Sequence, residues 1–160
     1  MSNKGEGMEC LGCKLANKKE KVFIVYENDY VCCILDHIPF NEGHVLILPK
    51  QHFHDVDELD SLNANAIMIA SILITKAIKE IFNPDGITIN QNNGMFNELK
   101  HYHLHVVPRY QKQNFASFYA EYDGVNIEAD CALANTQSKL VVAIKNIIGR
   151  EKDENNNREH

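Results

Sequence analysis

The sequence feature that most constrains the fold is a run in which histidines alternate with apolar residues, His101-Tyr102-His103-Leu104-His105. Strict alternation is typical of a β-strand with one face on a hydrophobic core. Side chains two residues apart on a strand share a face and lie about 6–7 Å from one another, so the three imidazoles are expected to form a row. Tyr102, Leu104 and Val106 would then anchor the opposite face. Pro108 lacks an amide donor and is expected to end the pairing.

A row of imidazoles suits metal binding, or nucleophilic and acid–base work at a phosphorus or acyl centre. The plainer alternative is a half-exposed structural strand that happens to carry histidines. Such a strand gains little from weakly polar rings that need hydrogen-bond partners. The row therefore indicates a functional site.

Composition excludes several classes of protein. With 160 residues the chain is expected to form one domain with a substantial core, and an apolar content of 44% argues against disorder. The net charge of −6 argues against a general nucleic-acid binder, although small phosphate ligands remain compatible with it. We find no apolar run of transmembrane length, and the first twenty residues are unlike a secretory signal. We therefore expect a cytoplasmic protein that binds neither membrane nor nucleic-acid polymer.

The five cysteines, an odd number, do not suggest a disulfide scaffold. Cys10 and Cys13 form a C-x-x-C pair whose thiolates could both bind one zinc at about 2.3 Å, with Gly12 allowing the turn between them. Such a pair is half a site, and two further ligands could come from the eight histidines. The redox alternative expects a preceding strand in a βαβ unit, which this position lacks. The other cysteines are expected to be buried apolar residues: Cys32, Cys33 and Cys131.

Hydrophobic patterns predict five strands and two helices. The strands are expected at 22–26, 30–35, 44–48, 87–91 and the histidine run, the first three as an antiparallel meander. The long helix is expected at 61–82, capped by Ser61 and ended by Asn83-Pro84-Asp85-Gly86. Its expected apolar stripe is Leu62, Ala66, Ile69, Ala70, Leu73, Ala77 and Ile81, and Met68 and Ile72 widen this surface, which could also face a second subunit. The second helix is expected at 127–148, with the stripe Leu133, Leu140, Ile144, Ile147 and Ile148.

The chain ends are polar. Residues 1–8 are expected to be disordered, 9–149 to form a single domain, and 150–160 to form a solvated tail. Between the histidine strand and the second helix, four aromatic residues could wrap the sheet or a partner subunit: Phe115, Phe118, Tyr119 and Tyr122.

The sequence His-Tyr-His-Leu-His-Val-Val at 101–107 resembles the histidine triad motif of the HIT superfamily. The strand ending at Asp36, the segment Pro49–His52, the long helix and the strand ending near Asn90 fall in the order expected for that family. The resemblance implies an α+β, HIT-like fold with a five-stranded antiparallel sheet and two helices. It also implies a homodimer whose sheets join, and an activity on nucleotides such as derivatives of AMP or GMP.

The resemblance makes His103, the middle histidine, the nucleophile that attacks the α-phosphate. A neutral imidazole with a pKa of about 6.5 is nucleophilic at neutral pH, which agrees with this role. A nucleotidyl-histidine intermediate would form and then be hydrolysed by water. By the same resemblance His105 would contact phosphate oxygens or assist proton transfer to the leaving group.

Three further substrate-binding residues follow from the resemblance. Asp36 matches a carboxylate that binds the ribose hydroxyls, and Asn90 an asparagine near the sugar and phosphate, although Asp36 could simply begin a turn and Asn90 hold a loop. Asn97 and Glu98 occupy the positions of a Gln-Ser pair that grips phosphate, and Phe96 replaces a glycine. Asn97 can supply the amide, whereas Glu98 supplies no hydroxyl donor and its charge would repel phosphate.

Members of this superfamily with an N-terminal C-x-x-C resemble a subtype that binds zinc through two cysteines and two histidines. The resemblance assigns the ligands Cys10, Cys13, His52 and His101, with His54 as the competitor of His52. Four protein ligands with no open position would make a structural zinc site.

Three functions are therefore compatible with the sequence. The first is a hydrolase that releases a nucleoside monophosphate from a phosphoramidate or a dinucleoside polyphosphate. The second is a nucleotide-binding module with little or no turnover, and the third is a metal-binding or scaffolding dimer.

Overall fold

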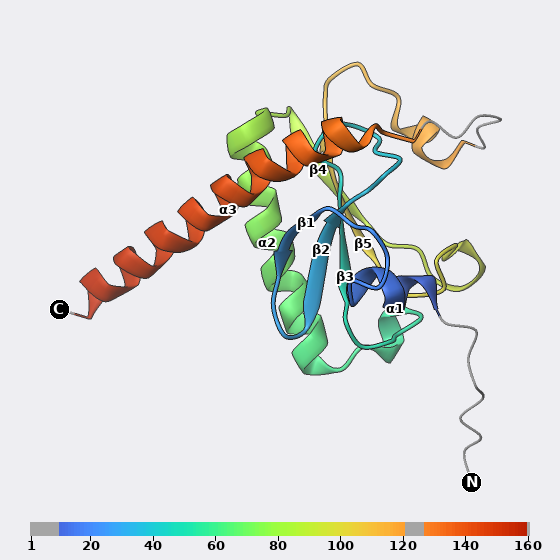
Figure 1. The fold of residues 1–160 in the computed structure, drawn as a ribbon, viewed down its shortest axis with the longest axis horizontal. Coiled ribbons are helices and arrows are strands. Elements are labelled where there is room, and N and C mark those ends of the chain that lie inside the picture. Colours follow the sequence, from blue (N-terminus) through green and yellow to red (C-terminus); the bar gives the residue numbers. More distant parts are fainter. Residues whose placement is uncertain (1–9, 121–126, 160) are drawn as a thin grey trace, which may run out of the picture.

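An antiparallel sheet of five strands forms the centre of the fold (Figure 1). A computed structural model describes residues 10–120 and 127–159, so the expected disorder of residues 1–8 and the position of Tyr122 lie outside it. The strands follow the spatial order β1-β2-β3-β5-β4, with β5 between β3 and β4. Their bounds are β1 Ile24–Glu27, β2 Val31–Leu35, β3 Val45–Pro49, β4 Gly86–Asn90 and β5 Leu104–Arg109. The five-stranded antiparallel sheet and the meander of its first three strands are thus confirmed.

In the described part of the chain three α-helices accompany the sheet: α1 Leu11–Ala16, α2 Ser61–Phe82 and α3 Asp130–Arg158. Short 3-10 turns lie between them: η1 Val56–Glu58, η2 Gly94–Phe96 and η3 Phe115–Tyr119. The bounds of α2 agree with the sequence prediction. The helix α1, which contains Cys13, was expected only as a turn.

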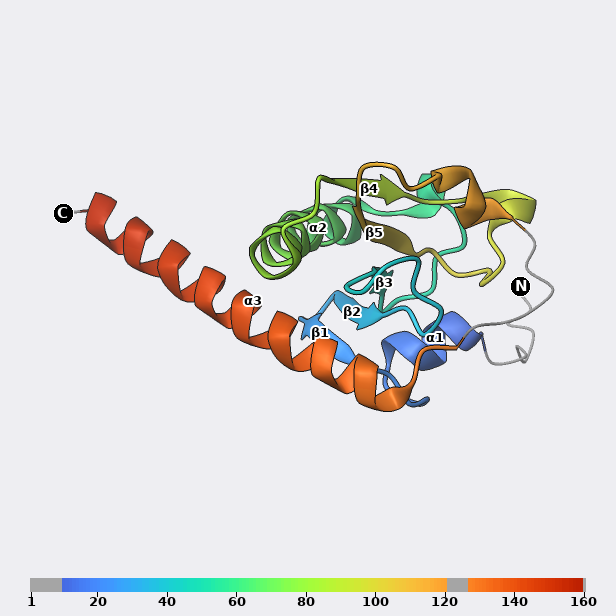
Figure 2. The same cartoon turned by 90° about the horizontal axis from the view of Figure 1, so that it is seen from above.

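Alternation along the strands gives the sheet two different faces. The core face carries Val31, Cys33, Val45, Ile47 and Val106, which pack with buried residues of α2 and α3. The other face carries Cys32, Ile34, Leu46 and Leu48, which pack against Leu15 and Ala16 of α1. We call this second side the α1 face. Figure 2 shows α2 and α1 on opposite sides of the strands.

Pro108 does not end the pairing of β5, contrary to the prediction. It is paired with Ile87 of β4, and the ladder continues to Arg109. On its other edge, β5 pairs with β3 only as far as Val106. The carbonyl of Pro108 accepts a hydrogen bond from Asn41 Nδ2 at 2.7 Å, so the polar backbone groups of this residue face the edge where the β3 ladder has ended. Because Pro108 lacks a backbone N–H on an edge that has no ladder partner, the proline removes no hydrogen bond from the sheet.

The expected apolar stripe of α2 is displaced around the helix. Ala66, Ala70, Leu73 and Ala77 are buried as predicted, together with Ile67, Ile74 and Ile78. Leu62, Ile69 and Ile81 are exposed instead, along with Met68 and Ile72. The helix is long and apolar enough to cross a membrane by length and composition, which the sequence analysis did not expect. Its packing on the core face accounts for much of that apolar character.

The second predicted helix is longer than expected. Residues 150–158 of the expected polar tail are the exposed last turns of α3, and this end projects past the sheet (Figure 1). Lys76 and Glu80 of α2 pair with Glu151 and Arg150 of α3. Cys32 and Cys33 are fully buried as predicted, whereas Cys131 is exposed, because residues 127–131 at the start of α3 are all exposed.

The residue that caps α2 is Asp60 rather than Ser61. Its carboxylate accepts from Asn63 N at 2.8 Å and from Asn63 Nδ2 at 2.9 Å and 3.0 Å. We expect Asp60→Ala to lower the free energy of unfolding by about 1 kcal/mol, because amide groups of the first turn lose their acceptor. Ser61→Ala is the control and should change it by less than about 0.5 kcal/mol. Urea denaturation measures both, and equal effects would contradict the assignment.

Candidate functional site

The three histidines of the alternating run lie on the α1 face, while Tyr102, Leu104 and Val106 lie in the core, as predicted. His105 is paired with Leu46 of β3 and with Asn90 of β4. Residues directly opposite in an antiparallel sheet point to the same face, so these side chains share the α1 face with His105. The rings of His103 and His105 lie 4.9 Å apart between centroids.

Only the second half of the run belongs to the strand, since β5 begins at Leu104. The predicted strand from His101 is therefore wrong for its first three residues. Their backbone groups have other partners: Tyr102 N donates to Phe53 O at 2.7 Å, and His101 O accepts from the ring of His103. These bonds keep the rings on one face without a ladder.

His103 has one ring nitrogen that is held, Nδ1, and one, Nε2, that has no hydrogen-bond partner among the described residues. Its Nδ1 lies 2.8 Å from His101 O, which can only accept, so Nδ1 carries the hydrogen. The neutral ring then has its lone pair on Nε2. The side chain is 8% exposed, which keeps the ring fixed but reachable. This arrangement aims a nucleophilic nitrogen away from the backbone.

His44 was not recognised in the sequence and belongs to the same cluster. Phe40 N donates to His44 Nδ1 at 3.1 Å, so the hydrogen of this ring is on Nε2. His44 Nε2 lies 2.9 Å from His105 Nδ1 and donates to it. His105 therefore carries its own hydrogen on Nε2, as a donor. Register could have found His44, because it precedes Val45 on the α1 side of β3.

Burial keeps both rings of this pair neutral. Burial, with His105 and His103 close by, lowers the pKa of His44 to about 3. Burial and His103 lower the pKa of His105 to about 3. An added proton would have to enter at a nitrogen that already accepts a hydrogen bond. Of the two roles expected for His105, donation to a phosphate oxygen therefore fits the geometry better than release of a stored proton.

Asp36 follows β2 and lies beside this pair. Its Oδ1 accepts from Ile38 N at 2.9 Å, and its Oδ2 lies 3.6 Å from His44 Nε2. Burial raises the pKa of the carboxyl. The side chain is 15% exposed, so the carboxyl group is partly accessible to a ligand.

Asn90, the last residue of β4, differs in its surroundings from Asn97 and Glu98, which lie in the loop before β5. Asn90 Nδ2 donates to Tyr119 Oη at 3.0 Å, and Asn90 Oδ1 is buried and has no hydrogen-bond partner within residues 10–120 and 127–159. Asn97 is buried, and its Nδ2 donates to His54 O at 2.7 Å. Glu98 is exposed, so its charge is solvated.

Aromatic residues of η3 cover the His105 end of the cluster. The ring of Phe118 lies 5.3 Å from His105 and 5.9 Å from His44, centroid to centroid. Phe115 stacks on Phe118 at 4.9 Å. Of the two expectations for this stretch, contact with the sheet is the one seen in the described residues.

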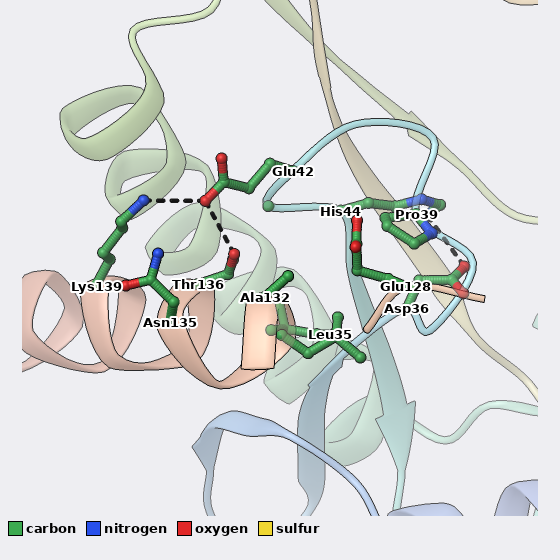
Figure 3. A pocket seen from close by; sticks show the side chains of 12 residues that line it. Leu35, Asp36, Pro39, Glu42, His44, Glu128, Ala132, Asn135, Thr136 and Lys139 are labelled. Atoms are coloured by element: carbon green, nitrogen blue, oxygen red, sulfur yellow. Dashed lines mark hydrogen bonds and ion pairs between the residues drawn. The ribbon is translucent and has the colours of Figure 1, made fainter. Parts of the chain in front are cut away.

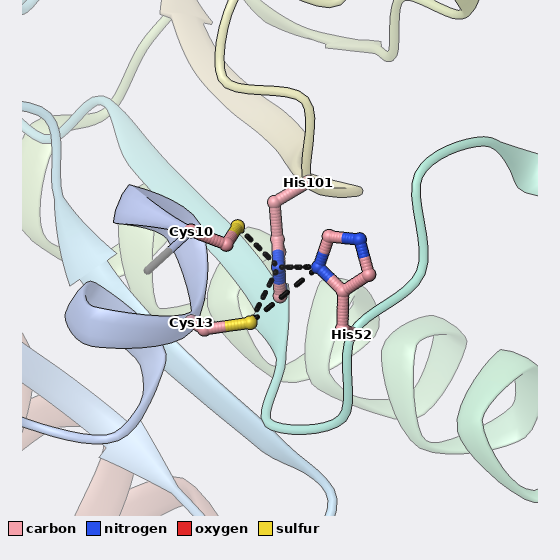
Figure 4. Close-up of side chains that lie close together, drawn as sticks. All are labelled: Cys10, Cys13, His52 and His101. Atoms are coloured by element: carbon pink, nitrogen blue, oxygen red, sulfur yellow. Dashed lines mark hydrogen bonds between the residues drawn. The ribbon is translucent and has the colours of Figure 1, made fainter. Parts of the chain in front are cut away.

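A second cluster joins Cys10, Cys13, His52 and His101 (Figure 4). His101 Nδ1 lies 3.6 Å from each sulfur, His52 Nδ1 lies 3.4 Å from Cys13 Sγ, and the two Nδ1 atoms are 3.3 Å apart. His54 takes no part, since its Nδ1 lies 2.7 Å from Asp55 Oδ1. His101 Nε2 donates to Pro49 O at 2.9 Å, which leaves Nδ1 as the ligand atom.

These distances fit a tetrahedral zinc ion. Zn–S bonds of about 2.3 Å and Zn–N bonds of about 2.0–2.1 Å place sulfur and nitrogen about 3.6 Å apart and two nitrogens about 3.3 Å apart. Gly12 explains how α1 comes so close, because a Cβ there would lie 2.2 Å from His101 Cβ. The glycine is needed for this approach rather than for the turn proposed from the sequence.

A cavity of about 240 Å³ lies between the loop 36–43 and α3 (Figure 3). Glu42 Oε1 accepts there from Thr136 Oγ1 and Lys139 Nζ, each at 3.0 Å. Asp36 and His44 belong to its lining, but His103 and His105 do not. The cavity therefore adjoins the histidine cluster through Asp36 and His44 and does not include the two triad histidines.

Comparison with known proteins agrees with this geometry. Residues 17–112 match the HIT domain family, and the chain belongs to that family. An uncharacterized HIT-like protein of Methanocaldococcus jannaschii is 32% identical over 122 residues, covering 74% of this chain and 93% of that protein. A yeast protein, the adenosine 5′-monophosphoramidase of Saccharomyces cerevisiae, is 35% identical over 105 residues, covering 62% of each chain.

A solved structure also resembles the chain, that of a zinc-bound histidine triad family protein from Mycobacterium smegmatis. It has a TM-score of 0.73 and 26% identity, and the match covers 89% of this chain and 98% of the other. The HIT fold inferred from the sequence is thus confirmed. Zinc is bound by that relative, and the Cys/His cluster here suggests the same metal.

The buried histidine pair predicts a loss of stability in acid. His44 and His105 have pKa values of about 3 when folded, against an ordinary value of 6.5. Below about pH 6.5 both rings become protonated in the unfolded chain but stay neutral in the folded chain. Each ring therefore lowers the free energy of unfolding by up to about 1.4 kcal/mol for every pH unit of acidification. Burial raises the pKa of Asp36, so this carboxyl acts in the opposite direction, because the folded chain protonates it at a higher pH than the unfolded chain does.

His105→Asn removes one of these rings, and we expect a shallower fall between pH 6.5 and pH 5. Urea denaturation at pH 7, 6 and 5 measures the slope. If the free energy of unfolding of the variant falls with pH as steeply as that of the wild type, His105 takes up its proton in the folded chain over the same pH range as in the unfolded chain, and the assignment is wrong.

Proposed function

We propose that the chain is a hydrolase that releases a nucleoside 5′-monophosphate from a phosphoramidate or a dinucleoside polyphosphate. The observation that carries the proposal is the free Nε2 of His103, aimed by the hydrogen bond from Nδ1 to His101 O. The name of the yeast relative, a monophosphoramidase, supports this reaction class. The alternative is a HIT module that binds nucleotide with little or no turnover.

The reaction has two steps in which His103 is the nucleophile. In the first, its Nε2 lone pair forms a bond to phosphorus. The bond from phosphorus to the leaving atom breaks, and that atom keeps the electron pair and takes a proton from water. In the second, a water molecule attacks phosphorus and loses a proton, while the P–N bond breaks and returns its electron pair to Nε2.

The other residues bind the nucleotide in this proposal. Asp36 accepts hydrogen bonds from the ribose hydroxyls, which the partial exposure of its side chain allows. His105 donates from Nε2 to a phosphate oxygen, since its Nδ1 is held by His44. Asn90 of β4 is paired with His105 of β5, and in this proposal its side chain lies next to the phosphate. The contact of Asn97 with phosphate stays a prediction, and one hydrogen of its amide is already bonded to His54 O.

We further propose that Cys10, Cys13, His52 and His101 hold a structural zinc. With four protein ligands the ion has no open position, so it would stabilise the fold and supply no step of the reaction. Burial, and then Cys10, raise the pKa of Cys13 to about 11, so a bound metal must displace a proton from this thiol. The ion would fix α1 against the residues that carry His103.

The expected homodimer and the cytoplasmic location also remain proposals. Two observations support a dimer: β4 is an edge strand, and four apolar side chains on the outer side of α2 are at least half exposed, Leu62, Met68, Ile69 and Ile72. Pairing of two β4 edges would join the sheets, and the apolar side chains would then be covered.

The test of the proposed reaction is turnover of adenosine 5′-phosphoramidate and diadenosine triphosphate. We expect His103→Ala to lower kcat by roughly 10³-fold or more, because the nucleophile is lost. His54→Gln is the control, a histidine outside the triad, and should keep kcat within about twofold. Calorimetry with AMP decides between the functions, because binding without any turnover by the wild type would support the module.

Removal of zinc should lower both the melting temperature and kcat. Gly12→Ala is expected to do the same without a chelator, since the new Cβ would overlap the Cβ of His101. Gly149→Ala in α3 is the matched control, because nothing lies within 4 Å of its added Cβ. Metal analysis and thermal denaturation measure the effects. Unchanged melting temperature and activity after complete zinc removal would refute a structural role.

A further inference from the structure

Three groups of the proposed site lie on or next to the loop that joins β2 to β3, residues 36–43. Asp36 begins this loop, the backbone N–H of Phe40 donates to the ring of His44, and His44 follows the loop directly. The two ends of the loop are joined, because Asp36 N donates to His44 O at 3.0 Å. A displacement of His44 therefore displaces Asp36 as well.

Side-chain packing supports the loop on the side of η3. Phe40 lies edge-on against Phe115 there, with the ring centroids 5.2 Å apart. On the side of α3 lies the cavity of about 240 Å³, and Asp36 and His44 are part of its wall (Figure 3). Residues 36–42 are half-buried or exposed, and none of them belongs to the hydrophobic core of the described chain. On this side the loop therefore depends on hydrogen bonds for its position.

Two connections span the cavity among the described residues. Near the start of the loop, Glu128 N donates to His37 O at 2.8 Å. Near its end, Glu42 Oε1 accepts from Thr136 Oγ1 and from Lys139 Nζ, each at 3.0 Å (Figure 3). We call these two bonds of the Glu42 carboxylate the Glu42 anchor. The anchor joins the loop to the first half of α3.

The bond from Thr136 is the part of the Glu42 anchor with which water competes least. Thr136 is 4% exposed, so its hydroxyl depends on a partner within the protein. The side chains of Lys139 and Glu42 are 42% and 52% exposed, so water and salt screen their ion pair, which contributes little. Removal of the carboxylate would deprive a buried hydroxyl of its acceptor and separate the end of the loop from α3.

We propose that Glu42 and Thr136 are positioning residues for the nucleotide site: their hydrogen bond holds the loop so that Asp36 meets the ribose hydroxyls. Glu42 is two positions from His44, and His44 O is bonded to Asp36 N, so a shift of Glu42 reaches the Asp36 carboxylate through a short path. A small displacement of a positioned group is enough to weaken its contacts with a ligand. The inference rests on the proposed function, which places the ribose at Asp36.

The experiment compares the Kd of AMP with that of 2′,3′-dideoxy-AMP by calorimetry. The wild type should bind AMP more tightly by about tenfold or more, because the ribose hydroxyls donate to a carboxylate, and Asp36→Ala should remove this preference. We expect Glu42→Ala and Thr136→Val each to lower the ratio of the two Kd values by about threefold. The double variant should lower it no further, since both changes remove the same bond. A general loss of stability would weaken both nucleotides equally and leave the ratio unchanged.

Two further variants serve as controls. Glu42→Gln retains a side-chain oxygen that can accept from Thr136, so it should keep the ratio of the wild type. Glu80→Ala also removes a carboxylate that pairs with α3, but its partner is Arg150, about three turns beyond Lys139. This variant should leave the ratio unchanged.

The outcomes separate the inference from the proposed function. If the wild type prefers AMP and the ratio is unchanged in both Glu42→Ala and Thr136→Val, the role of the Glu42 anchor is overturned and the ribose contact of Asp36 stands. A ratio that falls as far in Glu42→Gln as in Glu42→Ala would overturn the role of Thr136. Equal binding of the two nucleotides by the wild type would overturn the ribose contact and the anchor with it. The hydrolase is tested by turnover instead, so its failure would appear in a different measurement.

Discussion

The site depends on His101, which contacts the Cys/His cluster with its ring and the ring of His103 with its backbone carbonyl. Its ring nitrogen Nδ1 faces Cys10, Cys13 and His52, while its carbonyl accepts the hydrogen bond from His103 Nδ1 at 2.8 Å. Rotation of the ring is opposed by the bond from Nε2 to Pro49 O. A shift of His101 would therefore change both the distances within the Cys/His cluster and the orientation of the His103 ring.

Backbone groups decide which nitrogen carries the hydrogen in each ring. Phe40 N puts the hydrogen of His44 on Nε2, and through it the hydrogen of His105 also on Nε2. The carbonyl of His101 does the opposite to His103 and puts its hydrogen on Nδ1. One ring thus offers a lone pair and its neighbour offers a donor, although both are histidines two residues apart on the same face.

Much of this could be predicted from the sequence, where a local pattern carries the information. The alternation at 101–105 predicts that the three histidines lie on one face. The Asn-Pro-Asp-Gly stretch at 83–86 predicts where α2 ends. His44 was missed because a single histidine at the head of an apolar strand has no pattern, and its role comes from strand register. Asp60 and Ser61 are both good caps, so only coordinates could separate them. The exposure of Cys131 depends on how α3 lies on the sheet.

The Cys/His cluster joins two distant parts of the chain, since Cys10 and His101 are 91 positions apart. An ion held there would act as a cross-link that closes most of the domain into one loop. Closing a loop of this length lowers the conformational entropy of the denatured chain, which raises its free energy by about 4–5 kcal/mol. During synthesis, two thiols would leave the ribosome long before the last ligand. Both thiols would then wait without their histidine partners until residue 101 emerges.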